Sequence, residues 1–108
     1  MIETADACYP VDFKYTPGRP HRNHLLQLAG YSLLVSEHFS KPVPAGFIFI
    51  IPDDLTFRFP MGETLLSEAR STLTTMREMI EHETFPEATP VRARCVDCEY
   101  RNFCADVF

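Results

Sequence analysis

Val11-Asp12-Phe13-Lys14 decides the fold, because it ends a segment from Cys8 that is typical of a β-strand. Residues two apart on a strand leave the same face, so Asp12 and Lys14 are expected side by side. Pro10 marks the strand, predicted over residues 8–14, as irregular or near an edge. Phosphodiester cleavage uses carboxylates to hold a divalent cation and a positive group near the attacking water. Taken alone, the pair favours a surface ion pair on an edge strand, and a metal-dependent nuclease site with Asp12 as the metal ligand and Lys14 orienting the water is the alternative.

A helix is predicted after this strand, beyond a loop over residues 16–20 that is rich in Pro and Gly. The helix runs from about Asn23, its expected N-cap, to Phe39. His24, Gln27 and Tyr31 are spaced at i, i+3 and i+7, which places them on one face. This polar face either meets solvent or lines a nucleic-acid channel, where the amide bonds phosphate or water and the phenol stacks.

The middle of the chain predicts a hairpin followed by a second helix. The continuous apolar run over residues 47–51 is typical of a central strand buried on both faces. A turn over residues 52–54 leads into a strand in which apolar and polar residues alternate, so that one face is more exposed to solvent. The second helix, over residues 63–83, should bury one apolar stripe, which comprises Leu66, Ala69, Leu73, Met76 and Ile80.

Three cysteines close together near the end of the chain have the spacing of metal ligands, Cys95-x2-Cys98-x5-Cys104. Three thiolates and a fourth ligand suit an iron–sulfur cluster or tetrahedral zinc. Free thiols are the alternative. Cys8 lies on the strand beside the predicted site and is not expected to be the fourth ligand. His24 and His82 are the other candidates for a zinc site.

Composition limits the possible functions further. The 108 residues fit a single domain over 1–108 with a cysteine tail over 90–108, and 45% apolar content argues against disorder. No apolar stretch is long enough for a membrane span and no secretory signal opens the chain, so we expect a cytoplasmic protein without a membrane partner. A net charge of −5 argues against non-specific electrostatic binding of nucleic acid over the whole protein surface. A local basic patch remains at Lys14, Arg19 and Arg22.

The strand Val-Asp-Phe-Lys, the helix Gln-Leu-Ala-Gly-Tyr and the cysteine tail together resemble the CRISPR-associated RecB-like exonucleases, the Cas-four family. The resemblance covers residues 9–106, with the three motifs in the family's order. It implies an α/β fold with a partial PD-(D/E)xK restriction-endonuclease-like core, in which a mixed sheet is flanked by helices. It also implies a metal-dependent DNA exonuclease that trims prespacers for the Cas-one/Cas-two integrase in CRISPR adaptation.

By this resemblance each motif acquires a role. Asp12 and Lys14 match the acid and lysine of the catalytic strand, with Asp12 as ligand to Mg²⁺ or Mn²⁺. Gln27 and Tyr31 match the Gln-x3-Tyr motif. Cys95, Cys98 and Cys104 match three ligands of an iron–sulfur cluster. A 4Fe-4S cluster is expected in preference to a 2Fe-2S cluster, and zinc is the alternative. Apart from the resemblance, the basic patch and the polar helix face predict that Arg19, Arg22 and His24 contact DNA.

The chain also departs from the family pattern. Its N-terminal portion is short, so the first cluster cysteine, a metal-binding His and a second catalytic Asp have no counterpart. Glu3 and Asp6 are expected near a hairpin turn rather than over Asp12. A single carboxylate holds Mg²⁺ or Mn²⁺ poorly, so weak or no activity is expected from this chain. Its uncovered sheet edge predicts a homo-oligomer. A non-catalytic DNA-binding scaffold and a small zinc or iron–sulfur interaction module are the alternative functions.

Overall fold

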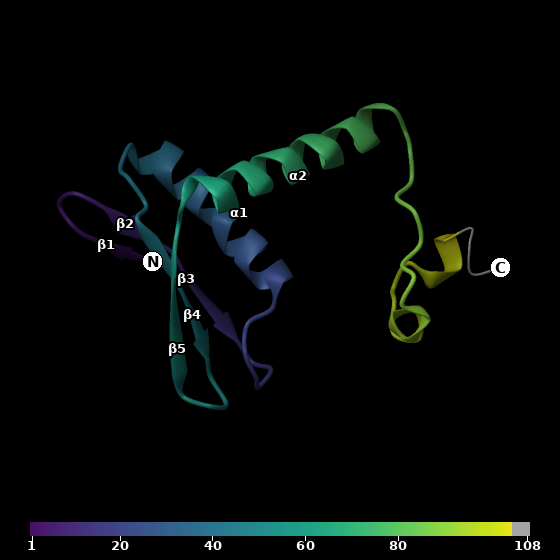
Figure 1. The fold of residues 1–108 in the computed structure, drawn as a ribbon, viewed down its shortest axis with the longest axis horizontal. Helices are drawn as coiled ribbons and strands as arrows, with labels where there is room; N and C mark the ends of the chain where they lie inside the picture. Colours follow the sequence, from purple (N-terminus) through teal and green to yellow (C-terminus); the bar gives the residue numbers. More distant parts are fainter. Residues whose placement is uncertain (105–108) are drawn as a thin grey trace. The chain divides into compact units, whose positions relative to one another are not determined.

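The computed structural model describes residues 1–104, which form two compact units. The first unit comprises Met1–Thr75 and the second begins at Met76. Figure 1 shows the strands and helix α1 of the first unit, and the short helical turns of the second. The boundary falls inside helix α2 (Glu63–Glu81).

The first unit is built on a three-stranded mixed sheet in the order β3-β4-β5. Strand β3 (Val11–Lys14) runs parallel to β4 (Ala45–Ile50), and helix α1 (Arg22–Phe39) connects them. Strand β5 (Leu55–Pro60) returns antiparallel to β4. The predicted α/β class, the buried central strand and the hairpin are therefore confirmed.

The predicted strand over residues 8–14 is split in two. Strand β2 (Cys8–Tyr9) pairs with β1 (Ile2–Glu3) in a separate two-stranded sheet, while β3 begins only after Pro10. Proline has no N–H to donate, so it cannot continue a ladder as donor. The carbonyl of Pro10 instead accepts a hydrogen bond from the N–H of Phe47, and this bond opens the β3–β4 pairing.

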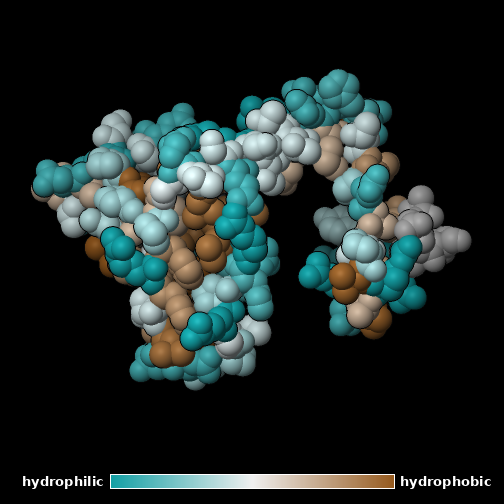
Figure 2. Space-filling view, viewed as in Figure 1, coloured by the Kyte–Doolittle hydropathy of each residue, from teal (hydrophilic) through white to brown (hydrophobic). Residues whose placement is uncertain are grey.

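Helix α1 packs on the sheet through its apolar face. Leu28 and Ala29 are fully buried against Ile48 and Ile50 of β4. This face fits closely, because Gly46 leaves room for the Leu28 side chain. Figure 2 shows apolar side chains surfacing between hydrophilic ones in the first unit. The buried core therefore holds helix α1, which carries Gln27, against strand β4, and β4 in turn pairs with the strand β3 that carries Asp12.

Two helical details differ from the predictions. Helix α1 begins one residue earlier than predicted, with His21 rather than Asn23 as the N-cap, because the His24 ring binds the backbone N–H of His21. The stripe of α2 is only partly covered. Ala69 is buried, but Leu73, Met76 and Ile80 are exposed, since the stripe extends beyond the surface that the core offers it.

The second unit holds the end of α2 and two short 3₁₀ helices, η1 (Arg92–Cys95) and η2 (Arg101–Phe103). The described part of its tail, from residue 90 to 104, is irregular outside these turns. Among residues 1–104 no helix combines the length and apolar character that crossing a bilayer requires.

Candidate active site

A connected row of polar side chains joins strand β3 to helix α1. Lys14 Nζ lies 2.8 Å from Asp12 Oδ2, and it donates a hydrogen bond of 2.8 Å to Gln27 Oε1. The Gln27 amide in turn donates to the Tyr31 hydroxyl at 3.0 Å. The four residues therefore form one row from a carboxylate to a phenol, which we call the polar row. The strand puts its first two members on one face and the helix puts its last two one turn apart.

The carboxylate of Asp12 is the least solvated part of this row. Its side chain is 14% exposed, and its Oδ2 atom is buried. Oδ2 is close to the Lys14 ammonium, but the approach lacks hydrogen-bond geometry, so the contact is electrostatic. A buried carboxylate oxygen without a hydrogen bond retains a lone pair for a cation or a donor.

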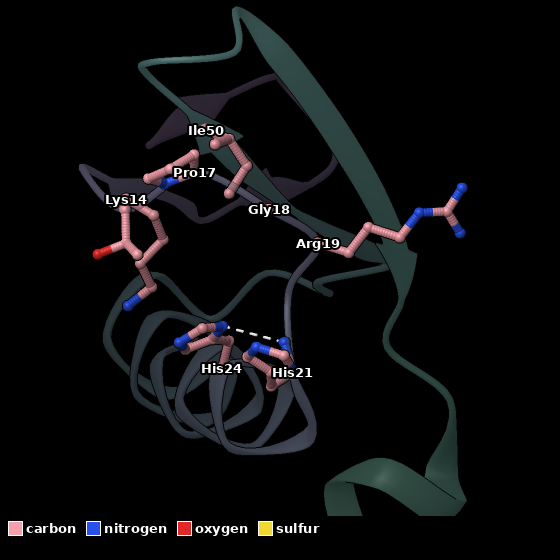
Figure 3. A pocket seen from close by; sticks show the side chains of 8 residues that line it. Lys14, Pro17, Gly18, Arg19, His21, His24 and Ile50 are labelled. Carbon is pink, nitrogen blue, oxygen red and sulfur yellow. Dashed lines mark hydrogen bonds between the residues drawn. The ribbon is translucent and has the colours of Figure 1, made fainter.

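A small pocket of about 70 Å³ opens beside the polar row. Figure 3 shows Lys14 and His24 directed toward the same space, from β3 and from the first turn of α1. Residues 16–19 form part of its wall. The Gly18 N–H donates to the Asp53 carboxylate at 2.9 Å, which ties this loop to the β4–β5 turn. Gly18 has a φ of +105°, a conformation that side chains rarely adopt.

His24 is held as a neutral hydrogen-bond donor. Its Nδ1 accepts a hydrogen bond of 3.0 Å from the His21 N–H, so in the neutral ring the proton resides on Nε2. Burial lowers the pKa of His24, and the positive charges of Lys14 and His21 lower that pKa further. The negative charge of Asp12 raises the pKa and so offsets part of the decrease. A neutral ring with Nε2–H can donate to a phosphate oxygen, but that nitrogen has no lone pair for a metal.

The two predicted DNA-binding arginines are placed differently. Arg19 is exposed at the pocket, and Figure 3 shows its guanidinium directed away from Lys14 and His24. Arg22 forms an ion pair with Glu68 of α2. A cation that already pairs with a carboxylate contributes less free energy to phosphate binding, because the existing ion pair must first be broken. Arg19 is thus the more available of the two.

The residues present do not complete a divalent cation site. Asp12 Oδ2 is suited to be one ligand, but residues 1–104 contain no group of three His, Cys, Asp or Glu side chains placed to hold an ion. Glu3 pairs in register with Cys8 and forms a 2.6 Å ion pair with Lys41, so it lies away from Asp12. Mg²⁺ demands near-octahedral oxygen ligation, and one carboxylate beside an ammonium supplies too little of it.

The four cysteines form no disulfide among the described residues. Cys95 ends η1, Cys98 follows in a turn in which its N–H donates to the Cys95 carbonyl at 3.4 Å, and Cys104 follows η2. Among the described residues these thiols do not form a three-ligand group. His82 Nδ1 lies 2.9 Å from the Glu78 carbonyl oxygen of its own helix. Cys8 is fully buried in β2.

Sequence reasoning missed two positions that shape the site. Gly46 allows the close approach of α1, and a glycine inside a strand run is a recognised signal of such an approach. Asp53 was assigned only to a turn, yet it fixes the loop that forms the pocket. No local sequence pattern predicts the hydrogen bond between Gly18 and Asp53, since the two residues are 35 apart in the chain.

An acid and a lysine on one strand, facing a Gln/Tyr helix in a β-α-β unit, define a nuclease core of the PD-(D/E)xK type. The profile of the PD-(D/E)XK nuclease superfamily matches residues 1–105, and the chain belongs to this superfamily. The chain is also 30% identical over 106 residues to the CRISPR-associated exonuclease Cas4 of Francisella tularensis subsp. novicida (strain U112). That match covers 98% of this chain and 53% of the relative, so the chain spans about half the relative's length. The resemblance to RecB-like exonucleases is confirmed.

Proposed function

We propose that this chain carries the catalytic strand and polar helix of a metal-dependent DNA exonuclease that processes prespacers in CRISPR adaptation, in the cytoplasm. The polar row of Asp12, Lys14, Gln27 and Tyr31 is the observation that carries the proposal. Superfamily membership and the similarity to an exonuclease support it. With one carboxylate in place, the chain alone has weak or no activity.

Each member of the polar row has a distinct task in this proposal. PD-(D/E)XK nucleases generally use divalent ions, which supply charge neutralisation and an activated water when bound. In this chain Asp12 offers one ligand oxygen. Lys14 orients the attacking water and offsets negative charge that develops on the phosphate. The Gln27 carbonyl fixes the ammonium, and Tyr31 accepts from the amide and so fixes which end of Gln27 faces Lys14.

The test is an end-labelled DNA degradation assay with Mg²⁺ or Mn²⁺ at the highest practical protein concentration. Lys14→Ala should abolish whatever metal-dependent degradation the chain shows. Lys41→Ala is the matched control, because Lys41 also pairs with a carboxylate, that of Glu3, outside the polar row. Equal activity in wild type, Lys14→Ala and Asp12→Ala would overturn the assignment of the row as catalytic.

DNA is proposed to approach through the pocket beside the row, with the Cas-one/Cas-two integrase as the protein partner. His24 Nε2–H and the exposed Arg19 supply donors to phosphate oxygens. Arg22 joins them where its pairing with Glu68 opens. Because the chain is acidic overall, binding through a few cations should be weak and steeply salt-dependent. Filter binding of a short duplex by Arg19→Ala, across salt concentrations, measures this contribution.

The tail is proposed to bind an iron–sulfur cluster, 4Fe-4S in preference to 2Fe-2S, through Cys95, Cys98 and Cys104. The spacing of the three thiols and their accessibility support this proposal. Zinc is the alternative, since thiolates also suit tetrahedral zinc. Anaerobic purification separates the two. A brown protein with iron and sulfide supports the cluster, and a colourless one with zinc supports the alternative.

A second candidate is a non-catalytic DNA-binding scaffold of the same fold. It is favoured by the lack of a three-ligand group among residues 1–104. In that case Asp12→Ala leaves DNA binding intact while Arg19→Ala weakens it, and no metal restores cleavage. A small zinc or iron–sulfur interaction module predicts that neither substitution affects DNA binding. The two assays therefore separate the three functions.

A further inference from the structure

The pocket beside the polar row has a lining without acidic side chains. Its walls come from the ends of β3 and β4, from the loop over residues 16–19 and from the start of α1. Within the described chain, its eight lining residues include no aspartate or glutamate, and two of them, Lys14 and Arg19, are basic. In a protein with a net charge of −5, this lining is suited to an anion.

Two hydrogen-bond donors are directed into this space. Figure 3 shows His24 and Lys14 converging on it from α1 and from β3. Since His24 Nδ1 accepts from the His21 N–H at 3.0 Å, the donor of the neutral ring is Nε2–H. The Lys14 ammonium donates to Gln27 Oε1 at 2.8 Å and keeps further N–H groups for a ligand. A ligand in the pocket therefore meets donors from both sides.

The electrostatic field at this point is positive, although Lys14 pairs with Asp12. Burial is the largest cause that lowers the pKa of His24, and the charge of Lys14 is the next. The opposite effect of Asp12 on the same pKa is smaller than that of Lys14. The first turn of α1 also contains no acidic residue, so the helix dipole adds to the field. The Lys14–Asp12 pair thus presents its positive end to the pocket.

The room in the pocket limits the size of the anion. Its volume is about 70 Å³, and a water molecule occupies about 30 Å³ in the liquid, so the space suits one tetrahedral group. Ile50, which is 2% exposed, forms an apolar part of the wall. The loop over residues 16–19 is already fixed by the hydrogen bond between Gly18 and Asp53, so little ordering is needed on binding. An internal phosphodiester continues into a sugar on both sides, whereas a terminal phosphate continues on one side only.

We propose that this pocket binds the terminal phosphomonoester of a DNA strand, with Lys14 and His24 donating to its oxygens and Arg19 at the rim. The inference rests on the proposed function, because it names the part of the substrate that the same site takes. A phosphomonoester carries about −1.5 to −2 charges at pH 7, whereas a phosphodiester carries a single negative charge. A pocket lined without carboxylates therefore favours the end of a strand over its interior. Because the pocket shares Lys14 with the polar row, a bound end places the adjoining nucleotides beside that row.

Fluorescence anisotropy with a chelator present measures binding apart from cleavage. Single strands of one sequence, labelled on an internal base, carry a 5′ phosphate, a 3′ phosphate or hydroxyls at both ends. A strand one nucleotide longer, without terminal phosphate, controls for the added charge. We expect the 5′ or the 3′ phosphorylated strand to bind about tenfold more tightly than both unphosphorylated strands, the effect of one further charge-assisted hydrogen bond.

Two outcomes of this titration overturn the proposal, and they differ in what they say about the proposed function. If all strands bind equally and all bind more weakly to Arg19→Ala, the DNA contact stands and recognition of the end is wrong. If no strand binds, the DNA contact of the proposed function fails, and recognition of the end fails with it.

A carboxylate placed in the lining tests the location of the site. Thr16 is exposed, so Thr16→Glu should fold, and it should abolish the preference for the phosphorylated end. Thr56→Glu is the matched control, because Thr56 is also exposed but lies on β5, outside the pocket lining. It should keep the tenfold preference. Loss of the preference in both variants, or in neither, overturns the assignment to this pocket.

Small phosphate esters test the pocket without DNA. In nitrogen-15 NMR spectra of the full chain at pH 7.5, methyl phosphate should shift the Nε2 resonance of His24. Dimethyl phosphate, the diester, should leave it in place. His38 is the internal control, since it is exposed in the last turn of the same helix. Equal shifts of both histidines, or an equal response to both esters, refutes a phosphomonoester site at His24.

Discussion

Gly46→Ala should loosen the packing that holds the polar row together. A Cβ at Gly46 would lie 2.9 Å from Cγ and Cδ2 of Leu28 and 3.0 Å from Cδ1. Ordinary contact begins at 3.4 Å, so α1 or the Leu28 side chain must move by 3.4 − 2.9, or about 0.5 Å. Leu28 is fully buried, which leaves it no free direction. Overpacking of this kind costs about 1–3 kcal/mol.

The expected net effect is smaller because alanine favours a strand over glycine by about 0.5–1 kcal/mol. We therefore expect a loss of about 0.5–2 kcal/mol in the free energy of unfolding, measured by urea titration followed by circular dichroism. The same displacement would lengthen the Lys14–Gln27 hydrogen bond from 2.8 Å toward the limit of such bonds. Any metal-dependent degradation of DNA should fall with it.

Gly30→Ala is the control for this substitution. Gly30 lies in the same helix as Leu28, and a Cβ there meets no atom within 4 Å. It should stabilise the protein by about 0.5–1 kcal/mol through helix propensity. The two glycine substitutions thus have opposite signs. A neutral or stabilising Gly46→Ala would refute the close approach of α1 to β4, and with it the geometry of the polar row.

Three further predictions concern the charges around the site. Lys14→Met should lower the free energy of unfolding by about 1–3 kcal/mol by leaving the Asp12 carboxylate without its cation, and adding Asp12→Asn should recover part of that loss in the same urea titration. The pKa of His24 is lowered in the folded chain, so the unfolded chain binds the proton more readily. The contribution of His24 to the free energy of unfolding should therefore be complete above about pH 6.5 and decline below it. His24→Gln should flatten this decline, measured as the urea midpoint of unfolding across pH. Asp53→Ala should cost about 1 kcal/mol and weaken DNA binding in filter assays, because it frees the Gly18 loop beside the pocket; a duplex affinity equal to wild type would separate that loop from DNA.

Local periodicity predicted most of the first unit. Alternation placed Asp12 and Lys14 on one face, helical spacing placed Gln27 and Tyr31 on another, and both predictions agree with the observed contacts. A continuous apolar run identified the buried strand β4. These features depend on intervals of two to seven residues, which the sequence displays directly.

Two of the features that escaped prediction depend on contacts between distant residues. The Arg22–Glu68 ion pair and the Gly18–Asp53 hydrogen bond join residues that are 46 and 35 apart. The early start of α1 depends on a His21–His24 bond, although histidine is not among the preferred capping residues. The exposed end of the α2 stripe depends on how far the core surface extends, which a helical period does not encode. Such features become predictable only once the fold is known.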